Sequence, residues 1–410
     1  MSQSPDKSFW EGRAREGKPF FQKGVPSRTS LHLLLLNYEY PPLGGGAGNA
    51  TANMARELVG LGHVVRVVTA SYGNLPKREV VDGYEVWRLP ALRRHADHCS
   101  PLEMLSFTAS AMVALPAMAR EFRPDACVAF FGIPCGPAAW ALRVLRGVPY
   151  IVSLRGGDVP GFQPYDLATY HKVTGPFIHF LWKRAAHVVA NSRGLAELAR
   201  KSAGTVPIRM IPNGVDAARF CPDAAATREG PVRLLFVGRL VRQKGLDVLL
   251  DALAKLPESA CFEATIVGDG PLRAELADRA ARLGLRDRVR FAGWVSRADM
   301  PDELRRADAF VFPSRDEGMP NAVLEAMASG LAVAATRIAG NEELVVDGET
   351  GFLVPPDDAA SLAGVLAKLV ADRTLCSRLG RAGRERAERE YSWRVVAGAY
   401  ADLCRQMAMR

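Results

Sequence analysis

The sequence lacks the patterns that mark membrane-spanning, disulfide-stabilised and zinc-binding proteins. No uninterrupted apolar run among its 410 residues approaches the roughly 18 to 20 that a bilayer-spanning helix needs. Its seven cysteines are odd in number and contain no C-x-x-C pair, so neither a disulfide framework nor a zinc site is indicated. The apolar run LHLLLLN is shorter than a secretory signal and is expected to be a buried strand. A location in the reducing cytosol fits these absences best.

Acidic residues are too few to balance the basic ones, and the net charge is +9. Residues 1–205 hold 24 Lys and Arg against 15 Asp and Glu, whereas residues 206–410 hold 29 of each kind. Residues 1–28 are expected to form a disordered basic tail, and without them the first half still carries +6. This excess favours an anionic partner or surface.

Short runs rich in Val, Ile and Leu alternate with amphipathic helical stretches, which predicts two α/β domains with doubly wound parallel sheets. One series of expected strands lies within 31–192, and a second lies within 232–336. The stretch IPNGVDAARFCPDAAATREGP between them is typical of a linker. Ligands of such sheets bind beyond the carboxyl ends of the strands, so we expect a site in the cleft between the domains. The expected boundaries are 29–205, 206–392 and, for a C-terminal helix that packs on the first domain, 393–410.

A glycine-rich loop, PPLGGGAG, precedes the first expected long helix. Gly44, Gly45, Gly46 and Gly48 allow the backbone to approach a ligand closely at a helix N-terminus, a place suited to phosphate. The spacing is neither that of a dinucleotide-binding fingerprint nor that of a P-loop, so a flexible turn is an equally good interpretation.

Two basic residues follow the first strand of the second series, in VGRLVRQKG. Arg239 and Lys244 lie between this strand and a helix, where both can project into the cleft. Either residue alone is most often a solvated surface charge, but a diphosphate would use both, Arg as a planar fork and Lys as a mobile point charge.

Two carboxylates stand in the stretch PSRDEGMPNAVLEAMASG. Glu317 lies in its turn, and Glu325 lies about two helical turns further on, among apolar residues. A buried charge needs a dedicated partner or access to solvent. The backbone amides of 318–321 open the helix and could meet an anion. The turn VGDGPL is of the same kind, and a turn of this kind most often serves only to reverse the direction of the chain.

The order of these motifs resembles that of the retaining glycosyltransferases of family 4, which have the GT-B fold of two Rossmann-like domains facing across a cleft. The resemblance extends from residue 30 to residue 407 and includes PPLGGGAG, IPNGVD, VGRLVRQKG, VGDGPL and EGMPNAVLEAMASG. Glu317 and Glu325 match the family's E-x7-E motif. Each motif alone is moderately specific, whereas the ordered set is highly specific.

The resemblance implies a role for each motif. Arg239 and Lys244 would hold the diphosphate of a nucleotide sugar without a metal, Glu317 would orient the donor sugar, and Glu325 would bind the ribose hydroxyls. Same-face attack on the sugar requires no protein nucleophile. The implied donor-binding set also contains Gly46, Gly268, Gly318, Met319, Pro320 and Asn321, and the implied acceptor-binding or sugar-binding set contains Gly45, Gly46, Ala47, Arg155 and Asp158.

The sequence departs from the family at Arg155, where many members have His. Arg cannot act as a base at ordinary pH. It could pair with an anionic donor sugar or acceptor phosphate, or form a structural ion pair with Asp158. Because of this departure the identity of the donor sugar is not determined, whereas the expected type of reaction is unchanged.

Two apolar segments bear on the acceptor. The segment GPFIHFLWKRAAH sets aromatic residues beside Lys183 and Arg184, and is more often core than a membrane-contacting face. The segment 101–122 is expected to be a buried helix interrupted near Pro116. With the basic first half, these segments suggest a lipid-linked, phosphate-bearing acceptor.

The sequence thus predicts a cytoplasmic, metal-independent, retaining hexosyltransferase. Its donor would be a UDP-, GDP- or ADP-sugar, and its acceptor a glycan or a lipid-linked molecule of the cell envelope or of an exopolysaccharide. An anionic membrane surface is an expected partner and nucleic acid is not. The alternatives are a sugar-nucleotide epimerase or phosphorylase of the same fold, and a non-catalytic sugar-nucleotide-binding protein.

Overall fold

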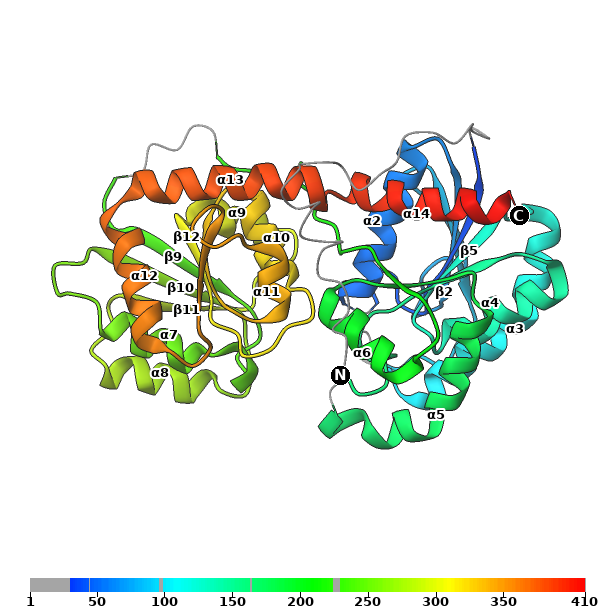
Figure 1. Cartoon of the computed structure of the whole chain (residues 1–410), viewed down its shortest axis with the longest axis horizontal. Coiled ribbons are helices and arrows are strands. Elements are labelled where there is room, and N and C mark those ends of the chain that lie inside the picture. Colours follow the sequence, from blue (N-terminus) through cyan, green and yellow to red (C-terminus); the bar gives the residue numbers. More distant parts are fainter. Residues whose placement is uncertain (1–29, 44, 96–98, 163, 224–228, 410) are drawn as a thin grey trace, which may run out of the picture.

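The computed structural model describes residues 30–409 except 44, 96–98, 163 and 224–228, so the expected disordered tail, 1–28, lies outside the described residues. Two α/β domains lie side by side, and the last two helices run along both of them (Figure 1). The expectation of two parallel α/β domains is confirmed.

The first domain contains one eight-stranded sheet in the order β3-β4-β2-β1-β5-β6-β7-β8, parallel except for the β3–β4 pair. Its elements are β1 (His32–Leu36), α2 (Gly46–Gly60), β2 (Val64–Ala70), β3 (Arg78–Val81), β4 (Tyr84–Leu89), α3 (Pro101–Phe122), β5 (Ala126–Phe130), α4 (Cys135–Arg146), β6 (Tyr150–Ser153), α5 (Pro164–Arg184), β7 (His187–Ala190), α6 (Arg193–Ala203) and β8 (Ile208–Met210). Because β8 pairs with β7, this sheet extends past residue 205, where the sequence suggests the boundary.

The second domain contains a six-stranded parallel sheet in the order β11-β10-β9-β12-β13-β14. Its elements are β9 (Val232–Val237), the 3-10 helix η1 (Arg242–Lys244), α7 (Leu246–Ala254), β10 (Phe262–Val267), α8 (Arg273–Arg282), β11 (Val289–Gly293), α9 (Met300–Arg306), β12 (Ala309–Phe312), α10 (Asn321–Ala328), β13 (Ala332–Thr336), α11 (Ala339–Leu344), β14 (Gly351–Val354), α12 (Ala359–Ala371) and α13 (Arg373–Tyr391).

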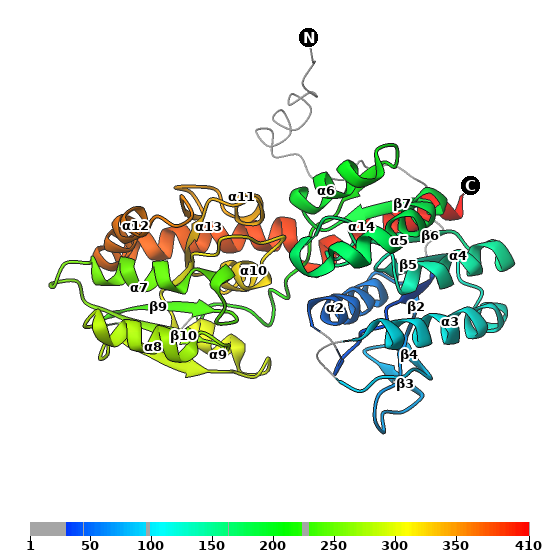
Figure 2. The same ribbon diagram turned by 90° about the horizontal axis from the view of Figure 1, so that it is seen from below.

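The last helix, α14 (Trp393–Ala408), belongs to the core of the first domain, as expected. Its buried residues pack with α2 against one face of the first sheet, and α3, α4 and α6 contribute to the core on the other face. Figure 2 shows α2 and α14 close to each other within the first domain, as does Figure 1. The first domain is therefore completed by the C-terminal segment.

The two chain segments that cross between the domains are hydrogen-bonded to each other. Val215 N donates to Tyr391 O (2.7 Å), and Trp393 N donates to Val215 O (3.2 Å). The backbone of Gly214 lies directly on the Trp393 ring, and a Cβ there would stand 2.5 Å from a ring carbon. The crossing is thus a short two-stranded ladder. At position 214 only glycine leaves room for the Trp393 ring.

The helix α3 differs from its expected form. It continues through Pro116 without interruption, so the expected break is wrong, although proline removes one backbone donor there. By length and composition α3 could cross a membrane (mean hydropathy 1.4), but one of its faces lies in the first-domain core. Length and composition alone are therefore weak evidence for a membrane span.

Candidate active site

The loops that leave the second sheet are bonded to one another. Ser314 Oγ and Arg315 N both donate to Gln243 O (3.0 and 2.7 Å), and Gln243 Nε2 donates to Asp316 O (2.6 Å). Gly245 has a positive φ of 66°, and its backbone packs against Pro313 so closely that a Cβ would overlap the carbonyl oxygen. The loop after β9 and the loop after β12 therefore form one unit.

This unit holds Lys244 and Glu317 together. The Lys244 ammonium forms an ion pair with Glu317 Oε1, which also accepts a hydrogen bond from Ser314 Oγ (2.7 Å). The ion pair is well covered, since only 18% of the Lys244 side chain and 12% of the Glu317 side chain are exposed. Lys244 also lies over the Phe312 ring, 5.1 Å from its centre. Each charge therefore holds the other at the carboxyl edge of the sheet.

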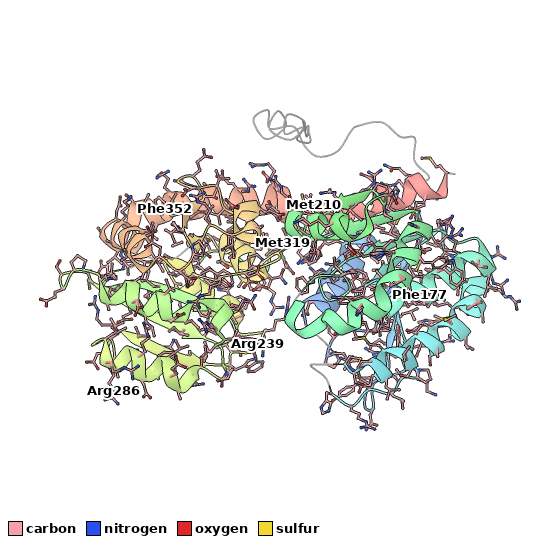
Figure 3. All side chains as sticks on the ribbon, turned by 60° about the horizontal axis from the view of Figure 1, so that its bottom comes forward. Phe177, Met210, Arg239, Arg286, Met319 and Phe352 are labelled. Atoms are coloured by element: carbon pink, nitrogen blue, oxygen red, sulfur yellow. The ribbon has the colours of Figure 1, made fainter. Side chains whose placement is uncertain are left out.

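Arg239 lies at the same edge, beyond the end of β9. It is exposed, and Figure 3 shows it, like Met319, on the side of the second domain that faces the first. The VGDGPL turn supports its loop, because Leu240 N donates to Asp269 O (2.9 Å) and the carbonyl oxygen of Gly238 packs on Gly268. Within the described residues, Arg239 has no ion-pair partner, so its guanidinium is available to an anion.

A pocket of about 230 Å³ opens between the domains. It brings together elements far apart in the sequence, namely the start of α2, the linker, the loop after β11 and the start of α10. Its polar lining includes Asn49, Asn53, Arg56, Asp216, Arg219, Arg297, Asn321 and Glu325. Two expected donor-binding residues of α10, Asn321 and Glu325, thus face the same space as Gly46 of the first domain.

Glu325 is partly buried in this pocket and forms no side-chain hydrogen bond within the described part of the chain. Burial raises its pKa to about 7, and Arg297 and Arg219 oppose that rise. Its apolar neighbours Val323, Leu324, Ala326 and Met327 are buried in the core, so Glu325 and Asn321 are the polar residues of α10 that line the pocket. Such a group suits a ligand with hydroxyl donors.

The glycine-rich loop reaches the pocket through Gly46, the first residue of α2. Its N-cap is Gly45, and no side chain caps this helix, so its first amides remain available to a ligand. A Cβ on Gly46 would lie 3.5 Å from Asn321 Nδ2 of the second domain. Ala47 contributes its carbonyl oxygen to Asn37 (3.2 Å), and Gly44 lies outside the described residues.

Arg155 and Asp158 do not form the ion pair that was one expectation. The Asp158 carboxylate accepts hydrogen bonds from the backbone N–H groups of Gly132, Arg155 and Gly156 (2.7, 2.9 and 3.2 Å), so it shapes its own loop. The Arg155 guanidinium instead donates to Asn213 Oδ1 (2.7 Å) and lies over the Phe130 ring. Burial lowers the pKa of Arg155 and raises that of Asp158.

The expected residues of the α10 turn divide into buried and open positions. Met319 and Pro320 are buried beneath the turn, and the Met319 sulfur accepts from Asn213 N (3.1 Å), whereas Gly318 is exposed with open space above it. Sequence reasoning missed Arg56, Asn213, Arg219 and Arg297. Asn213 and Arg219 lie in or just after the IPNGVD motif, which indicates the linker and belongs to the family's motif order but suggests no ligand contact by itself.

No group of three or more His, Cys, Asp or Glu suited to a metal ion occurs in the part of the chain that the structure describes. Metal independence stays a prediction.

Residues 45–214 match the glycosyl transferase 4-like domain, and residues 222–386 match the glycosyl transferases group 1 family. The lipopolysaccharide core biosynthesis glycosyltransferase LpsE of Rhizobium meliloti is 33% identical over 294 residues, covering 70% of this chain and 77% of that protein. The chain belongs to the group 1 glycosyltransferases. A glycogen synthase of Mycobacterium tuberculosis is 28% identical to this glycosyltransferase over 395 residues, covering 91% of this chain and 94% of that protein.

Solved structures support the GT-B fold. The sucrose-phosphate synthase of Thermosynechococcus elongatus superposes with a TM-score of 0.75 at 24% identity, covering 92% of this chain and 99% of that one. Anabaena HepE in complex with UDP-glucose superposes with a TM-score of 0.65 at 20% identity, covering 90% and 98%. The two domains of this glycosyltransferase therefore have the GT-B arrangement.

Proposed function

We propose that this glycosyltransferase moves a hexose from a nucleotide diphosphate sugar to a glycan or lipid-linked acceptor with retention of configuration. The observation that carries the proposal is the joint position of Lys244, Glu317 and Arg239 at one sheet edge, with Glu325 in the adjacent pocket. A sugar nucleotide needs cations for its diphosphate, a shielded carboxylate for its sugar and a hydrogen-bond acceptor for its ribose hydroxyls. Glu317 and Glu325 are proposed as the family's E-x7-E pair.

The proposed chemistry follows from charge. Breaking the bond between sugar and diphosphate builds negative charge on the leaving group, and fixed cations aimed at that charge stabilise the transition state. Arg239 and Lys244 supply two cations, and the available amides at the start of α2 supply dipoles of the same sign. Glu317 keeps Lys244 in place and lies where it can orient the sugar. The acceptor hydroxyl attacks on the face that the leaving group vacates and gives its proton to the departing phosphate, so the proposal needs no protein nucleophile or metal.

The names of the relatives support an acceptor in the cell envelope or in an exopolysaccharide. Besides the lipopolysaccharide core enzyme, one relative is the amylovoran biosynthesis glycosyltransferase AmsK of Erwinia amylovora, 32% identical over 318 residues. Anabaena HepE has been crystallised with UDP-glucose, which supports a UDP-sugar among the candidate donors. We place the enzyme in the cytoplasm.

A donor screen tests the proposal. UDP-, GDP- and ADP-sugars are compared for thermal stabilisation, since a ligand at 100 times its dissociation constant adds about 2.7 kcal/mol. The stabilising donor is then incubated with the protein, and NMR follows the anomeric configuration of the sugar that is released or transferred. We expect release with retention. Stabilisation without turnover would indicate a non-catalytic binder, and conversion to an epimer would indicate an epimerase.

We also propose that the first domain contacts an anionic bilayer that carries the acceptor. The supporting surface, termed here the outer face, consists of exposed apolar residues on three adjacent helices: Leu102, Leu105, Met112 and Val113 on α3, Val144 and Leu145 on α4, and Val173 and Phe177 on α5. Leu102 is 72% exposed and Val113 is 81% exposed. By contrast, Ile178, Leu181 and Trp182 of the aromatic segment are buried, so most of that segment is core.

Basic residues border the outer face. Arg146 Nε donates to Pro116 O (2.9 Å), and Arg143 donates to Arg184 O, so the end of α4 lies against both α3 and α5. Arg143, Arg146, Lys183 and Arg184 are all exposed there. Apolar side chains bordered by cations complement a bilayer of anionic lipid, where each basic residue near the surface contributes about 1 kcal/mol.

Vesicle sedimentation tests the outer face. Phosphatidylglycerol vesicles should bind the protein more strongly than phosphatidylcholine vesicles, and high salt should reduce the preference. The preference should survive removal of residues 1–26, and Val113→Glu with Leu145→Glu should abolish it. Val80→Glu on β3, which is 73% exposed, is the matched control. Equal binding to both lipids, or binding lost with the tail, would leave the outer face without this role.

A further inference from the structure

The linker residue Asn213 is hydrogen-bonded to both domains. On the first-domain side its Oδ1 accepts from Arg155 Nη1 (2.7 Å) and more weakly from Asn191 Nδ2 (3.4 Å). On the second-domain side its Nδ2 donates to Asn321 Oδ1 (3.2 Å), and its backbone N donates to the Met319 sulfur. Asn213 is buried, with 9% of its surface exposed, so solvent cannot easily replace these partners.

The chemistry of arginine decides the orientation of this amide. A guanidinium has only donors, so the group that meets Arg155 must be the oxygen of Asn213. The nitrogen of Asn213 must then face Asn321, and it can donate only to the oxygen of that second amide. The Asn321 nitrogen is left on the other side, beside Gly46 at the edge of the pocket. No hydrogen bond of the described residues uses this Asn321 Nδ2.

We propose that Arg155 is a positioning residue that acts through Asn213 to turn the N–H side of the Asn321 amide toward the phosphates of the bound donor. The inference rests on the proposed function, because it assumes a nucleotide diphosphate in this pocket. It accounts for an arginine at this position. A neutral histidine presents a donor at one ring nitrogen and an acceptor at the other, so it would not impose one orientation on Asn213.

The surroundings of Arg155 fit a fixed role. The guanidinium lies over the Phe130 ring, 4.7 Å from its centre, and its Nε is buried without a hydrogen-bond partner in the described structure. The Asp158 carboxylate holds the backbone of the same loop through two amides, those of Arg155 and Gly156. Arg155 is therefore held against the linker rather than extended toward an anionic sugar.

Asn213→Asp is the decisive variant. A carboxylate keeps the partner of Arg155 and strengthens it, but it has no donor for Asn321, so the Asn321 amide should turn its oxygen toward the phosphates. Isothermal titration with UDP, GDP and ADP, which carry no sugar, should show a loss of affinity of about 10- to 100-fold for the nucleotide that the wild type binds best. The melting temperature of the free protein should be unchanged or higher. The matching nucleoside should bind equally to both proteins.

Variants of the neighbouring residues sharpen the test. Arg155→Met removes the donor and should weaken diphosphate binding by a smaller factor, since the Asn213 amide can then take either orientation. Arg155→Lys should restore most of the affinity, and Asn191→Ala should change it least because its contact is the longer one. Unchanged diphosphate affinity in Asn213→Asp would overturn the proposed orientation of Asn321 through Asn213, while leaving the proposed function intact. Absence of wild-type binding to all three nucleotides would overturn both.

Discussion

The two domains hold their sides of the cleft in different ways. In the second domain, the loops around Lys244 and Glu317 are bonded to each other within one domain, through Gln243, Ser314 and Arg315. In the first domain, Arg155 depends on the linker residue Asn213, and the sheet itself depends on α14. The loops of the second domain are therefore held by contacts within that domain, whereas the first domain acquires its form from contacts with the rest of the chain.

Because of this difference, the two domains are expected to contribute to different steps, the second to the reaction and the first to binding. Residues proposed to meet the reacting bond lie in a preorganised unit, as electrostatic stabilisation of a transition state requires. Residues of the first domain, such as Gly46 and Arg56, line the pocket where the domains meet and lie outside this unit. Substitutions of Arg239, Lys244 and Glu317 should thus lower turnover, and substitutions of Gly46 and Arg56 should mainly alter affinity.

The largest expected effect is on the cations of the second domain. Lys244→Ala and Arg239→Ala should each lower kcat by about 100- to 1000-fold, the scale for one strong electrostatic contact in a transition state. Arg56→Ala in the first domain should mainly raise KM. Arg286, which Figure 3 places at the far end of the second domain, gives the control Arg286→Ala. Near-normal kcat in both cation variants would mean that the second domain does not carry the chemistry.

The two glutamates should differ in kinetics. Glu317→Gln should depress kcat, because it releases Lys244 and weakens the orientation of the sugar. Glu325→Gln should raise KM by about 10-fold with little change in kcat, because contacts to a non-reacting ribose are made equally in ground and transition states. Steady-state kinetics with the preferred donor separate the two outcomes. The reverse pattern would exchange the roles of the two residues.

The pH dependence of stability should reveal the burial of Glu325. Its folded-state pKa is raised to about 7 from 4.5, so its contribution to stability is fully present below pH 4.5 and is lost as the pH rises to 7. Glu325→Gln should therefore be more stable than the wild type at pH 8, by on the order of 3 kcal/mol, and similar to it at pH 4.5. Urea unfolding at the two pH values measures this difference. A constant difference would show that the carboxylate is not desolvated in the free enzyme.

The smallest effect concerns the crossing between the domains. Gly214→Ala places a Cβ against Trp393 and should destabilise the protein by about 1 to 3 kcal/mol. The matched control is Gly398→Ala within α14, where a Cβ meets nothing within 4 Å and should stabilise the helix by about 0.5 to 1 kcal/mol. Thermal unfolding of both variants is sufficient, and equal melting temperatures would contradict the tight crossing.

The sequence predicted the common edge of the second sheet better than the contacts of the first domain. Arg239, Lys244 and Glu317 follow strands of one parallel sheet, so their common edge follows from the alternation of strands and helices alone. The hairpin of β3 and β4 was missed, although Asp82 and Gly83 between two alternating strands are a strong hairpin signal. The partner of Arg155 could not be predicted, because Asn213 meets it only after the linker folds back across the first domain.

The return of α14 to the first domain has a consequence for synthesis on the ribosome. The core that joins Leu31 and Leu33 to Tyr400 and Cys404 spans nearly the whole chain, so the first domain cannot finish folding until the last helix has emerged. The second domain, from Val232 to Tyr391, is complete earlier and can fold first. Until α14 has been synthesised, the nascent first domain exposes the sheet face that α14 later covers, and a chaperone that shields apolar strands would act in that interval.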